Sequence, residues 1–267
     1  MVGGGPAGME AARTLAARGH DISLWERRGL GGQLAVAGVP PYKSEITQLS
    51  KCLVRQVQRS GVNILRGSEA TPESIEEMSP DVVVLATGSR PIMPEIPGIE
   101  KAKVALALDI LEGKAEVGER VVIIGGELVG CETAEYLANM GKTVTVLRRS
   151  AHMADKMNPD MRMMLVDRLE RMGVRLVPNV QYMLATDTGI RIHVRGGITS
   201  MAEIAADAMK NVAADTFVIA AGSIPDIDLA EALKGKKGLK VYSIGDCVEP
   251  RRIQEAIREG WKTALEI

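Results

Sequence analysis

Two glycine-rich stretches, GGGPAG at residues 3–8 and GGELVG at residues 125–130, decide the fold of this 267-residue chain. They lie 122 positions apart (125 − 3), and the same offset aligns the residues after them without a gap. The apolar run 22–25, for example, aligns with the run 144–147. A repeat of this length indicates a duplicated domain, because the repeats of solenoid proteins are much shorter.

Each copy has the order loop, helix, strand. After the loop, apolar residues recur at helical spacing, a glycine ends the helix, and a short apolar run follows. In the second copy, residues 121–124 also supply a strand before the loop. In a dinucleotide-binding βαβ unit the first glycine makes a tight turn, the second lets the main chain approach a pyrophosphate, and the third lets helix and strand pack closely. The sequence therefore predicts an α/β fold with two Rossmann-like dinucleotide-binding domains.

The residue that ends the second strand differs in charge between the copies. In the first copy it is Glu26, and a carboxylate there accepts hydrogen bonds from ribose hydroxyls and repels a 2′-phosphate. In the second copy it is Arg148, followed by Arg149, and guanidinium groups favour a 2′-phosphate through charge-assisted bonds. This predicts an unphosphorylated adenosine in the first copy and NADPH rather than NADH in the second. A solvated strand end is the alternative interpretation of the two arginines.

The composition argues against several classes of protein. The net charge of −1, from 33 basic and 34 acidic residues, lacks the basic excess of nucleic-acid-binding proteins. The three cysteines form no CxxC pair, which disfavours a disulfide scaffold or a zinc ribbon and favours a reducing cytoplasm. No apolar run approaches the ~18 residues of a membrane span, and the first residues do not resemble a signal peptide. We therefore expect a cytoplasmic protein that binds neither nucleic acid nor membrane.

Residue types that often carry chemistry are interpreted here as structural. Cys131 and Cys247 are expected to be small packing residues. The three histidines lack the spacing of metal ligands, so we predict no metal site, and we predict no catalytic side chain. The methionines within residues 153–172 are expected to fill the core, with a methionine-rich contact surface as the alternative.

Five motifs together resemble a known family: GGGPAG at 3–8, GGQL at 31–34, VPP at 39–41, GCET at 130–133, and IGDCVEP at 244–250. The chain is similar, over essentially its whole length, to part of the old yellow enzyme-like NAD(P)H:flavin oxidoreductases, the group with 2,4-dienoyl-CoA reductase and 2-enoate reductase. The part concerned is the C-terminal half of those enzymes. The resemblance implies the thioredoxin reductase-like architecture, in which the last strand and helix return to the first domain. An FAD-binding domain would then comprise residues 1–100 and 240–267, and an NAD(P)H-binding domain residues 101–239.

The resemblance also implies which residues contact the cofactors. Glu26 would bind the adenosine ribose of FAD, Asp246 its ribityl or pyrophosphate region, and the helix beginning near Ile253 would direct its N-terminus at the isoalloxazine. The candidate FAD-binding residues are Gly3, Gly5, Pro6, Ala7, Gly8, Glu26, Arg27, Gly32, Gln33, Leu34, Thr87, Gly88, Gly245, Asp246, Cys247 and Ile253. The candidate NAD(P)H-binding residues are Gly125, Gly126, Leu128, Val129, Gly130, Arg148, Arg149 and Gly222.

Three features depart from the family pattern. The barrel, its FMN site and its iron–sulfur cysteines precede this region in the family and are not in the printed sequence. Only Met1 and Val2 precede the first loop, where the second copy has residues 120–124, so we expect a fragment of a longer protein. Glu127 replaces the middle glycine of the second loop, where its charge either faces a pyrophosphate or turns outward to solvent.

The expected function is that of an oxidoreductase module that passes a hydride from NAD(P)H to FAD. Its electrons would then leave for an FMN- and iron–sulfur-bearing barrel domain or subunit, and this chain alone would not reduce an enoate. The alternative is a non-catalytic nucleotide-binding protein, or an electron-transfer subunit that docks on a separate FMN barrel protein.

Overall fold

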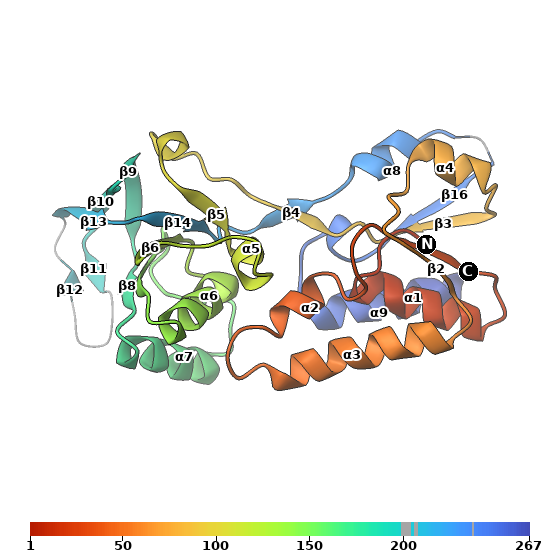
Figure 1. The fold of residues 1–267 in the computed structure, drawn as a ribbon, viewed down its shortest axis with the longest axis horizontal. Helices are drawn as coiled ribbons and strands as arrows, with labels where there is room; N and C mark the ends of the chain where they lie inside the picture. Colours follow the sequence, from red (N-terminus) through yellow and green to blue (C-terminus); the bar gives the residue numbers. More distant parts are fainter. Residues whose placement is uncertain (199–203, 206–207, 237) are drawn as a thin grey trace. The chain divides into compact units, whose positions relative to one another are not determined.

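The computed structural model describes residues 1–198, 204–205, 208–236 and 238–267. The chain forms two compact units, one made of Met1–Arg90 and Ser223–Ile267, the other of Pro91–Gly222 (Figure 1). The first unit is therefore discontinuous, as the sequence predicted. The two segments that connect the units contain β4 (Ser89–Pro91) and β15 (Ser223–Pro225), which pair with each other.

The unit boundaries differ from the predicted domain boundaries at 100/101 and 239/240. Residues 91–100 belong to the second unit, where Ile96 is buried in an apolar core with Val122 and Phe217. Residues 223–239 belong to the first unit, where Leu233 packs in a core with Leu85. These assignments depend on contacts between residues that lie far apart in the sequence. Local sequence patterns do not reveal such contacts.

A parallel sheet forms the centre of the first unit. Its strands are β1 (Ser23–Glu26), β2 (Asn63–Arg66), β3 (Val82–Leu85) and β16 (Lys240–Ser243). β1 pairs with β2, and β3 pairs with β16, both in parallel. Val2 forms parallel bridges to Trp25 of β1 and to Leu85 of β3. Val2, directly before the first glycine loop, thus lies between β1 and β3 in the sheet.

Helices cover both faces of this sheet (Figure 1). They are α1 (Pro6–Ala17), α2 (Gln33–Ala37), α3 (Ser44–Arg59), α4 (Pro72–Glu77), α8 (Asp228–Leu233) and α9 (Ile253–Glu266), with the 3-10 turn η2 (Gly245–Cys247). Val84 of β3 packs with α1 and α9, whereas its neighbours Val83 and Leu85 pack with α4 and α8. Alternate residues of one strand are buried on opposite faces, which explains the unbroken apolar run in the sequence.

The second unit has a five-stranded parallel sheet in the order β5-β14-β6-β7-β8. These strands are β5 (Val104–Leu106), β6 (Arg120–Ile124), β7 (Thr143–Leu147), β8 (Arg175–Val177) and β14 (Thr216–Ile219). The helices are α5 (Ala107–Leu111), α6 (Leu128–Asn139) and α7 (Pro159–Arg171), with the 3-10 turn η1 (Ile99–Lys101). Val121 and Ile123 of β6 face these helices, and Val122 and Ile124 face the opposite core.

An antiparallel sheet covers that opposite face. It contains β9 (Val180–Thr186), β10 (Gly189–Val194) and β13 (Ala208–Ala213), in the order β13-β10-β9. The short strands β11 (Gly197–Ile198) and β12 (Ile204–Ala205) pair with each other. Residues 190–194 lie within β10, where Ile190, Ile192 and Val194 are buried.

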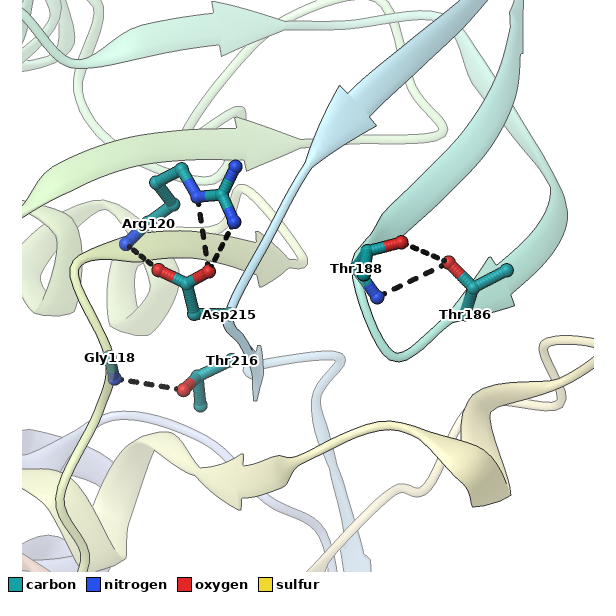
Figure 2. Close-up of polar contacts among 6 residues, drawn as sticks. All are labelled: Gly118, Arg120, Thr186, Thr188, Asp215 and Thr216. Carbon is teal, nitrogen blue, oxygen red and sulfur yellow. Dashed lines mark hydrogen bonds and ion pairs between the residues drawn. The ribbon is translucent and has the colours of Figure 1, made fainter.

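Polar contacts fix the start of β14 beside β6 (Figure 2). Asp215 accepts a hydrogen bond from the main-chain nitrogen of Arg120 at 2.8 Å and another from its guanidinium Nε at 3.0 Å. These bonds hold the pKa of the Asp215 carboxyl at about 2, below its ordinary value. Thr216 accepts a bond from the nitrogen of Gly118 at 2.9 Å. The second glycine loop follows β6, so these contacts anchor the strand that leads into it.

The methionines in and before α7 correct one prediction. Met153 is buried, as expected for a residue that fills the core, but Met161, Met163 and Met164 are exposed. The helix instead buries Leu165 and Leu169, one turn apart. Core filling is therefore wrong for the three exposed methionines, because they lie in the first turn or on the other faces of the helix.

Candidate functional site

The first glycine loop is shaped by contacts between main-chain atoms. Gly3 has a φ of 103°, and a Cβ atom there would lie 2.2 Å from the carbonyl oxygen of Ala86. A Cβ atom on Gly8 would lie 1.9 Å from the carbonyl oxygen of Gly3. A Cβ atom on Gly5, in contrast, meets no atom within 4 Å. The fold itself requires the first and third glycines, whereas the middle glycine borders open space, as an approaching ligand needs.

Helix α1 begins directly after this loop. Pro6 occupies its first turn, Gly5 is its N-cap, and no side chain caps it or places an acidic group in the first turn. Helix α9 packs closely against α1 at Ala7. A Cβ atom on Gly260 of α9 would lie 2.3 Å from the carbonyl oxygen of Ala7. The N-terminal N–H groups and the positive end of the helix dipole are therefore left for an anion.

Glu26 is fixed at the end of β1. The side chain is buried, and its Oε2 accepts a hydrogen bond from the nitrogen of Gly4 at 2.7 Å. Its Oε1 accepts a bond from the nitrogen of Arg28 at 2.6 Å. Arg27 instead forms an exposed ion pair with Glu69 at 3.2 Å. The structure thus places Glu26 at the glycine loop and directs the Arg27 guanidinium toward Glu69.

The segment at residues 31–34 lies against the first loop. Gly31 donates a hydrogen bond to the carbonyl oxygen of Gly4 at 2.8 Å. A Cβ atom on Gly32, whose φ is 52°, would lie 3.0 Å from the Cα of Gly5. Gln33 begins α2, and Leu34 is buried in the core. Gly32 and Gln33 therefore border the loop, whereas the side chain of Leu34 packs in the core of the first unit.

Thr87 and Gly88 follow β3. Thr87 Oγ1 donates a hydrogen bond to the carbonyl oxygen of Asp226 at 2.7 Å. A Cβ atom on Gly88, whose φ is 83°, meets nothing within 4 Å. Gln33 Nε2 donates to Ser89 Oγ at 3.1 Å. The turn after β3 is thereby linked to the segment beside the glycine loop.

The turn η2 brings Gly245 to α1. A Cβ atom on Gly245 would lie 2.9 Å from the Cβ of Ala7. The adjacent Asp246 is half-buried, and this desolvation raises the pKa of its carboxyl. Cys247 is buried and donates from Sγ to the carbonyl oxygens of Ile244 at 3.1 Å and Leu85 at 3.3 Å. Gly245 and Asp246 thus lie near the start of α1, and the thiol of Cys247 has a packing role, as predicted.

Two residues that position this turn were not predicted. Glu259 of α9 accepts a hydrogen bond from the nitrogen of Gly245 at 2.8 Å, and it also pairs with Arg251. Arg251 donates from its main-chain nitrogen to Asp246 Oδ1 at 3.2 Å. Ile253 begins α9, as predicted, and that helix has no side-chain cap. No local pattern marks Glu259, because its partner Gly245 lies 14 residues away.

The second glycine loop repeats the main-chain geometry of the first. Gly125 has a φ of 115°, and a Cβ atom there would lie 2.2 Å from the carbonyl oxygen of Ala220. A Cβ atom on Gly130 would lie 1.9 Å from the oxygen of Gly125. Glu127 stands at the middle position as the N-cap of α6, which begins with Leu128. The duplication predicted from the sequence is therefore also a duplication of loop geometry.

Side chains make the second loop different. Arg148 is buried, and its Nη2 donates to Glu127 Oε1 at 2.5 Å and to Asp155 Oδ2 at 3.0 Å. The Glu127 carboxylate is thus turned toward Arg148 in an ion pair, with its side chain 34% exposed. Sequence reasoning did not find Asp155, which carries no motif.

Among the other candidates near the second loop, Arg149, Val129 and Gly222 are exposed, whereas Gly126 is buried. Arg149 is exposed, and its carbonyl oxygen accepts a bond from the guanidinium of Arg195 at 3.2 Å. Val129, in the first turn of α6, is 46% exposed. Gly126 lies against Met153, since a Cβ atom there would be 2.4 Å from the sulfur. Gly222 has a φ of 105° and accepts a main-chain bond from Ile92 at 2.9 Å.

The Cys131 thiol and the potential metal ligands among the described residues are two kinds of group that often carry chemistry. Burial raises the pKa of the Cys131 thiol to about 12, so this cysteine packs, as predicted, and is not a nucleophile. Over the described residues, no cluster of His, Cys, Asp and Glu side chains has the size to hold a metal ion. None of the helices that the structure describes combines the length and apolar composition of a membrane span.

Two Rossmann-like units, each with a glycine loop that leads from the centre of a parallel sheet into a helix, define a class of protein that binds two dinucleotides. The chain belongs to the pyridine nucleotide-disulphide oxidoreductase family, whose model matches residues 1–260. It is thus an oxidoreductase of the type that uses FAD and a nicotinamide nucleotide.

Curated relatives and solved structures agree with this family. The chain is 37% identical over 272 residues to an NADH oxidase of Thermoanaerobacter brockii, and 34% identical over 271 residues to a cinnamate reductase of Clostridium sporogenes. Both matches cover 100% of this chain but only 40% and 39% of the relatives, so the chain spans about 40% of their length.

A solved complex of 2-naphthoyl-CoA reductase with 2-naphthoyl-CoA matches with a TM-score of 0.91 at 35% identity, over 100% of this chain and 39% of the other. A thioredoxin reductase of T. acidophilum matches with a TM-score of 0.71 at 20% identity, over 99% of this chain and 95% of the other, which shows the shared fold. The predicted fold class and family resemblance are confirmed.

Proposed function

We propose that the chain is the electron-entry module of a longer reductase, with FAD in the first unit and NAD(P)H in the second. When bound, the nicotinamide supplies a hydride from C4 and the flavin accepts it at N5. The observation that carries the proposal is Gly5, whose missing side chain borders open space between two glycines that the fold requires for its own packing. An open middle position is what a pyrophosphate approaching the main chain needs.

The residues of the first unit fit FAD. The loop from Gly3 to Gly8 and the uncapped start of α1 would hold the pyrophosphate through main-chain N–H groups. Both oxygens of Glu26 accept main-chain bonds, and each retains a second acceptor site for an adenosine ribose hydroxyl. Asp246, held by the main-chain nitrogen of Arg251, would accept from the ribityl chain or border the pyrophosphate.

The N-terminus of α9 would act on the flavin ring. The helix begins at Ile253, runs for 14 residues and has no side-chain cap. Its positive dipole end would stabilise negative charge on the reduced ring, so no side-chain acid or base is needed for hydride uptake.

The residues of the second unit fit a nicotinamide nucleotide. Gly125 and Gly130 give the loop the same main-chain shape as the first, and α6 has no acidic group within its first turn. Gly126, Leu128 and Val129 would border the pyrophosphate, and Arg148 and Arg149 the adenosine ribose. Glu127, as the N-cap, is the one element of this loop that opposes an anion.

The electrons would leave for an FMN- and iron–sulfur-bearing barrel, as a domain of the same protein or as a separate subunit. Support comes from relatives more than twice as long as the matched region, among them a reductase of cinnamate. In this proposal the protein works in the cytoplasm, where the exposed thiol of Cys52 stays reduced.

The test is to purify the full chain, load it with FAD and add NADH or NADPH without oxygen. Bleaching of the flavin absorption by either nucleotide supports the module. A chain that binds adenine nucleotides but neither retains FAD nor bleaches is the alternative, a non-catalytic nucleotide-binding protein. That alternative is favoured by one observation, the carboxylate of Glu127 in the second loop.

A further inference from the structure

We infer that Glu127 makes the second nucleotide site select NADH over NADPH, because it holds the Arg148 guanidinium away from a 2′-phosphate. The inference rests on the proposed function, since it requires a nicotinamide nucleotide in the second unit. It assigns the opposite selectivity to the one that the sequence predicted from Arg148 and Arg149.

The charge of Arg148 is already balanced by carboxylates. Its Nη2 donates to Glu127 at 2.5 Å and to Asp155 at 3.0 Å, with the arginine side chain 9% exposed. Asp155 in turn pairs with Arg162 at 3.4 Å. Two carboxylates and two guanidinium groups thus form one neutral chain of contacts. A 2′-phosphate would have to compete with Glu127 and Asp155 for Arg148.

The donors of Arg148 that remain beside these two bonds suit a phosphate poorly. The Nε atom has no hydrogen-bond partner among the residues that the structure describes, but it is buried, so a ligand does not reach it in this arrangement. A phosphate dianion is bound best by two parallel N–H groups of one guanidinium, and that pairing requires Nη2. The geometry of Arg148 therefore suits an unphosphorylated ribose.

The two copies reach the same arrangement from different positions. In the first copy the carboxylate comes from the strand end, where Glu26 accepts a bond from the loop nitrogen of Gly4 at 2.7 Å. In the second copy the strand end is Arg148 (26 + 122), and the carboxylate comes from the loop as Glu127 (5 + 122). A carboxylate is therefore the strand-end residue itself in the first copy and is paired with the strand-end residue in the second, and in either place it would repel a 2′-phosphate.

Arg149 opposes this selectivity and makes it depend on Glu127. Its side chain is exposed, and within the described ranges it forms no ion pair. With Glu127 charged, Arg149 alone attracts a 2′-phosphate. With Glu127 neutral, Arg148 would turn partly toward the same phosphate, and two guanidinium groups would act together.

The experiment measures binding of the oxidised nucleotides, NAD⁺ and NADP⁺, to the FAD-loaded full chain by calorimetric titration. Oxidised nucleotides leave the flavin unreduced, so the readout does not depend on turnover. We expect the wild-type chain to bind NAD⁺ more tightly. We expect Glu127→Gln to shift the ratio of the two dissociation constants toward NADP⁺ by about tenfold, the effect of one charge-assisted bond. Glu127→Gly, which restores the pattern of the first loop, should shift the ratio in the same direction if Glu127→Gln is unstable.

The matched control is Glu119→Gln. Glu119 pairs with Lys142 at 3.3 Å, is 67% exposed and precedes β6, so its neutralisation should leave the ratio unchanged. Wild-type preference for NADP⁺, or a ratio that moves equally in Glu119→Gln and Glu127→Gln, would overturn the inference while the proposed function stands. Failure of the wild-type chain to bind either nucleotide would overturn the proposed function itself.

Discussion

The Oε2 atom of Glu26 accepts a hydrogen bond from the main-chain nitrogen of Gly4 at 2.7 Å, which ties the end of β1 to the first glycine loop. A Cβ atom on Gly4 would lie 2.9 Å from the same oxygen, so the carboxylate lies directly beside the loop main chain. The contact positions a buried negative charge where the adenosine ribose of FAD would lie, and it makes Glu26 part of both the loop structure and the proposed ribose site.

Glu26→Gln tests this double role. Glutamine keeps the size of the side chain but removes the charge that strengthens its hydrogen bonds. We expect the affinity for FAD to fall by about tenfold or more, since a hydrogen bond to a charged group contributes roughly 1.5–3 kcal/mol. Fluorescence titration of the apoprotein with FAD measures the effect. Glu69→Gln is the control, because it removes a carboxylate from an exposed pair with Arg27 that contributes little. Equal losses in the two variants would contradict a specific ribose contact.

Alanine substitutions at Gly5 and Gly8 should separate binding from folding. Gly8→Ala places a Cβ atom 1.9 Å from the carbonyl oxygen of Gly3, which is main chain and cannot move away cheaply. Overpacking of this kind costs about 1–3 kcal/mol of unfolding free energy, or more. Gly5→Ala meets no protein atom within 4 Å and has an ordinary φ of −75°, so its cost should stay below about 1 kcal/mol.

Gly8→Ala should therefore lose more thermal stability than Gly5→Ala, whereas Gly5→Ala should show a clear loss of FAD retention. Thermal unfolding of the apoprotein should show the larger loss for Gly8→Ala. FAD retention at a temperature where both are folded should show a clear loss for Gly5→Ala, because its methyl group takes the space of the pyrophosphate. If Gly5→Ala retains FAD like the wild-type chain, the pyrophosphate does not approach the loop at that position.

The main-chain features of both sites could be predicted from the sequence. Gly3, Gly8, Gly125 and Gly130 are required by main-chain contacts within the loop or with the neighbouring strand end, so their spacing carries the information. Val2 takes a central position in the sheet with no strand of its own, since pairing uses main-chain groups that any residue supplies. These features depend on local spacing and on the repeat.

Side-chain partnerships could not be predicted in the same way. The sequence shows an arginine at position 148, but its ion pairs depend on where Glu127 and Asp155 direct their carboxylates. Glu259 likewise reaches Gly245 only because α9 packs beside η2. The direction of a side chain is set by the packing of whole elements, and a single sequence does not contain that packing explicitly.

The three cysteines should differ in reactivity. Cys52 is exposed, whereas Cys131 and Cys247 are buried, and burial raises the pKa of the Cys131 thiol to about 12. Because the thiolate is the reactive form, iodoacetamide at pH 8 should modify Cys52 in the folded chain and leave the other two thiols intact. Mass spectrometry of peptides gives the extent at each site, and all three should react in urea. Modification of Cys131 at the rate of Cys52 in the folded chain would contradict its packing role.

The ion pair of Asp215 and Arg120 should make the free energy of unfolding depend on pH in the acidic range. Hydrogen bonds from Arg120 lower the pKa of Asp215 from 3.8 to about 2 in the folded chain. Because the folded pKa is depressed, the stabilisation is complete well above pH 3.8 and is lost as the pH falls through about 2. Asp215→Asn keeps an acceptor for the Arg120 nitrogen but removes the charge. Urea unfolding should therefore show the variant less stable at pH 6, with the difference shrinking below pH 4.

Asp167→Asn removes a 54% exposed carboxylate that pairs with Arg171, and it should show little difference at either pH. A deficit of Asp215→Asn that is the same at every pH would mean that the residue acts through shape rather than through its charge.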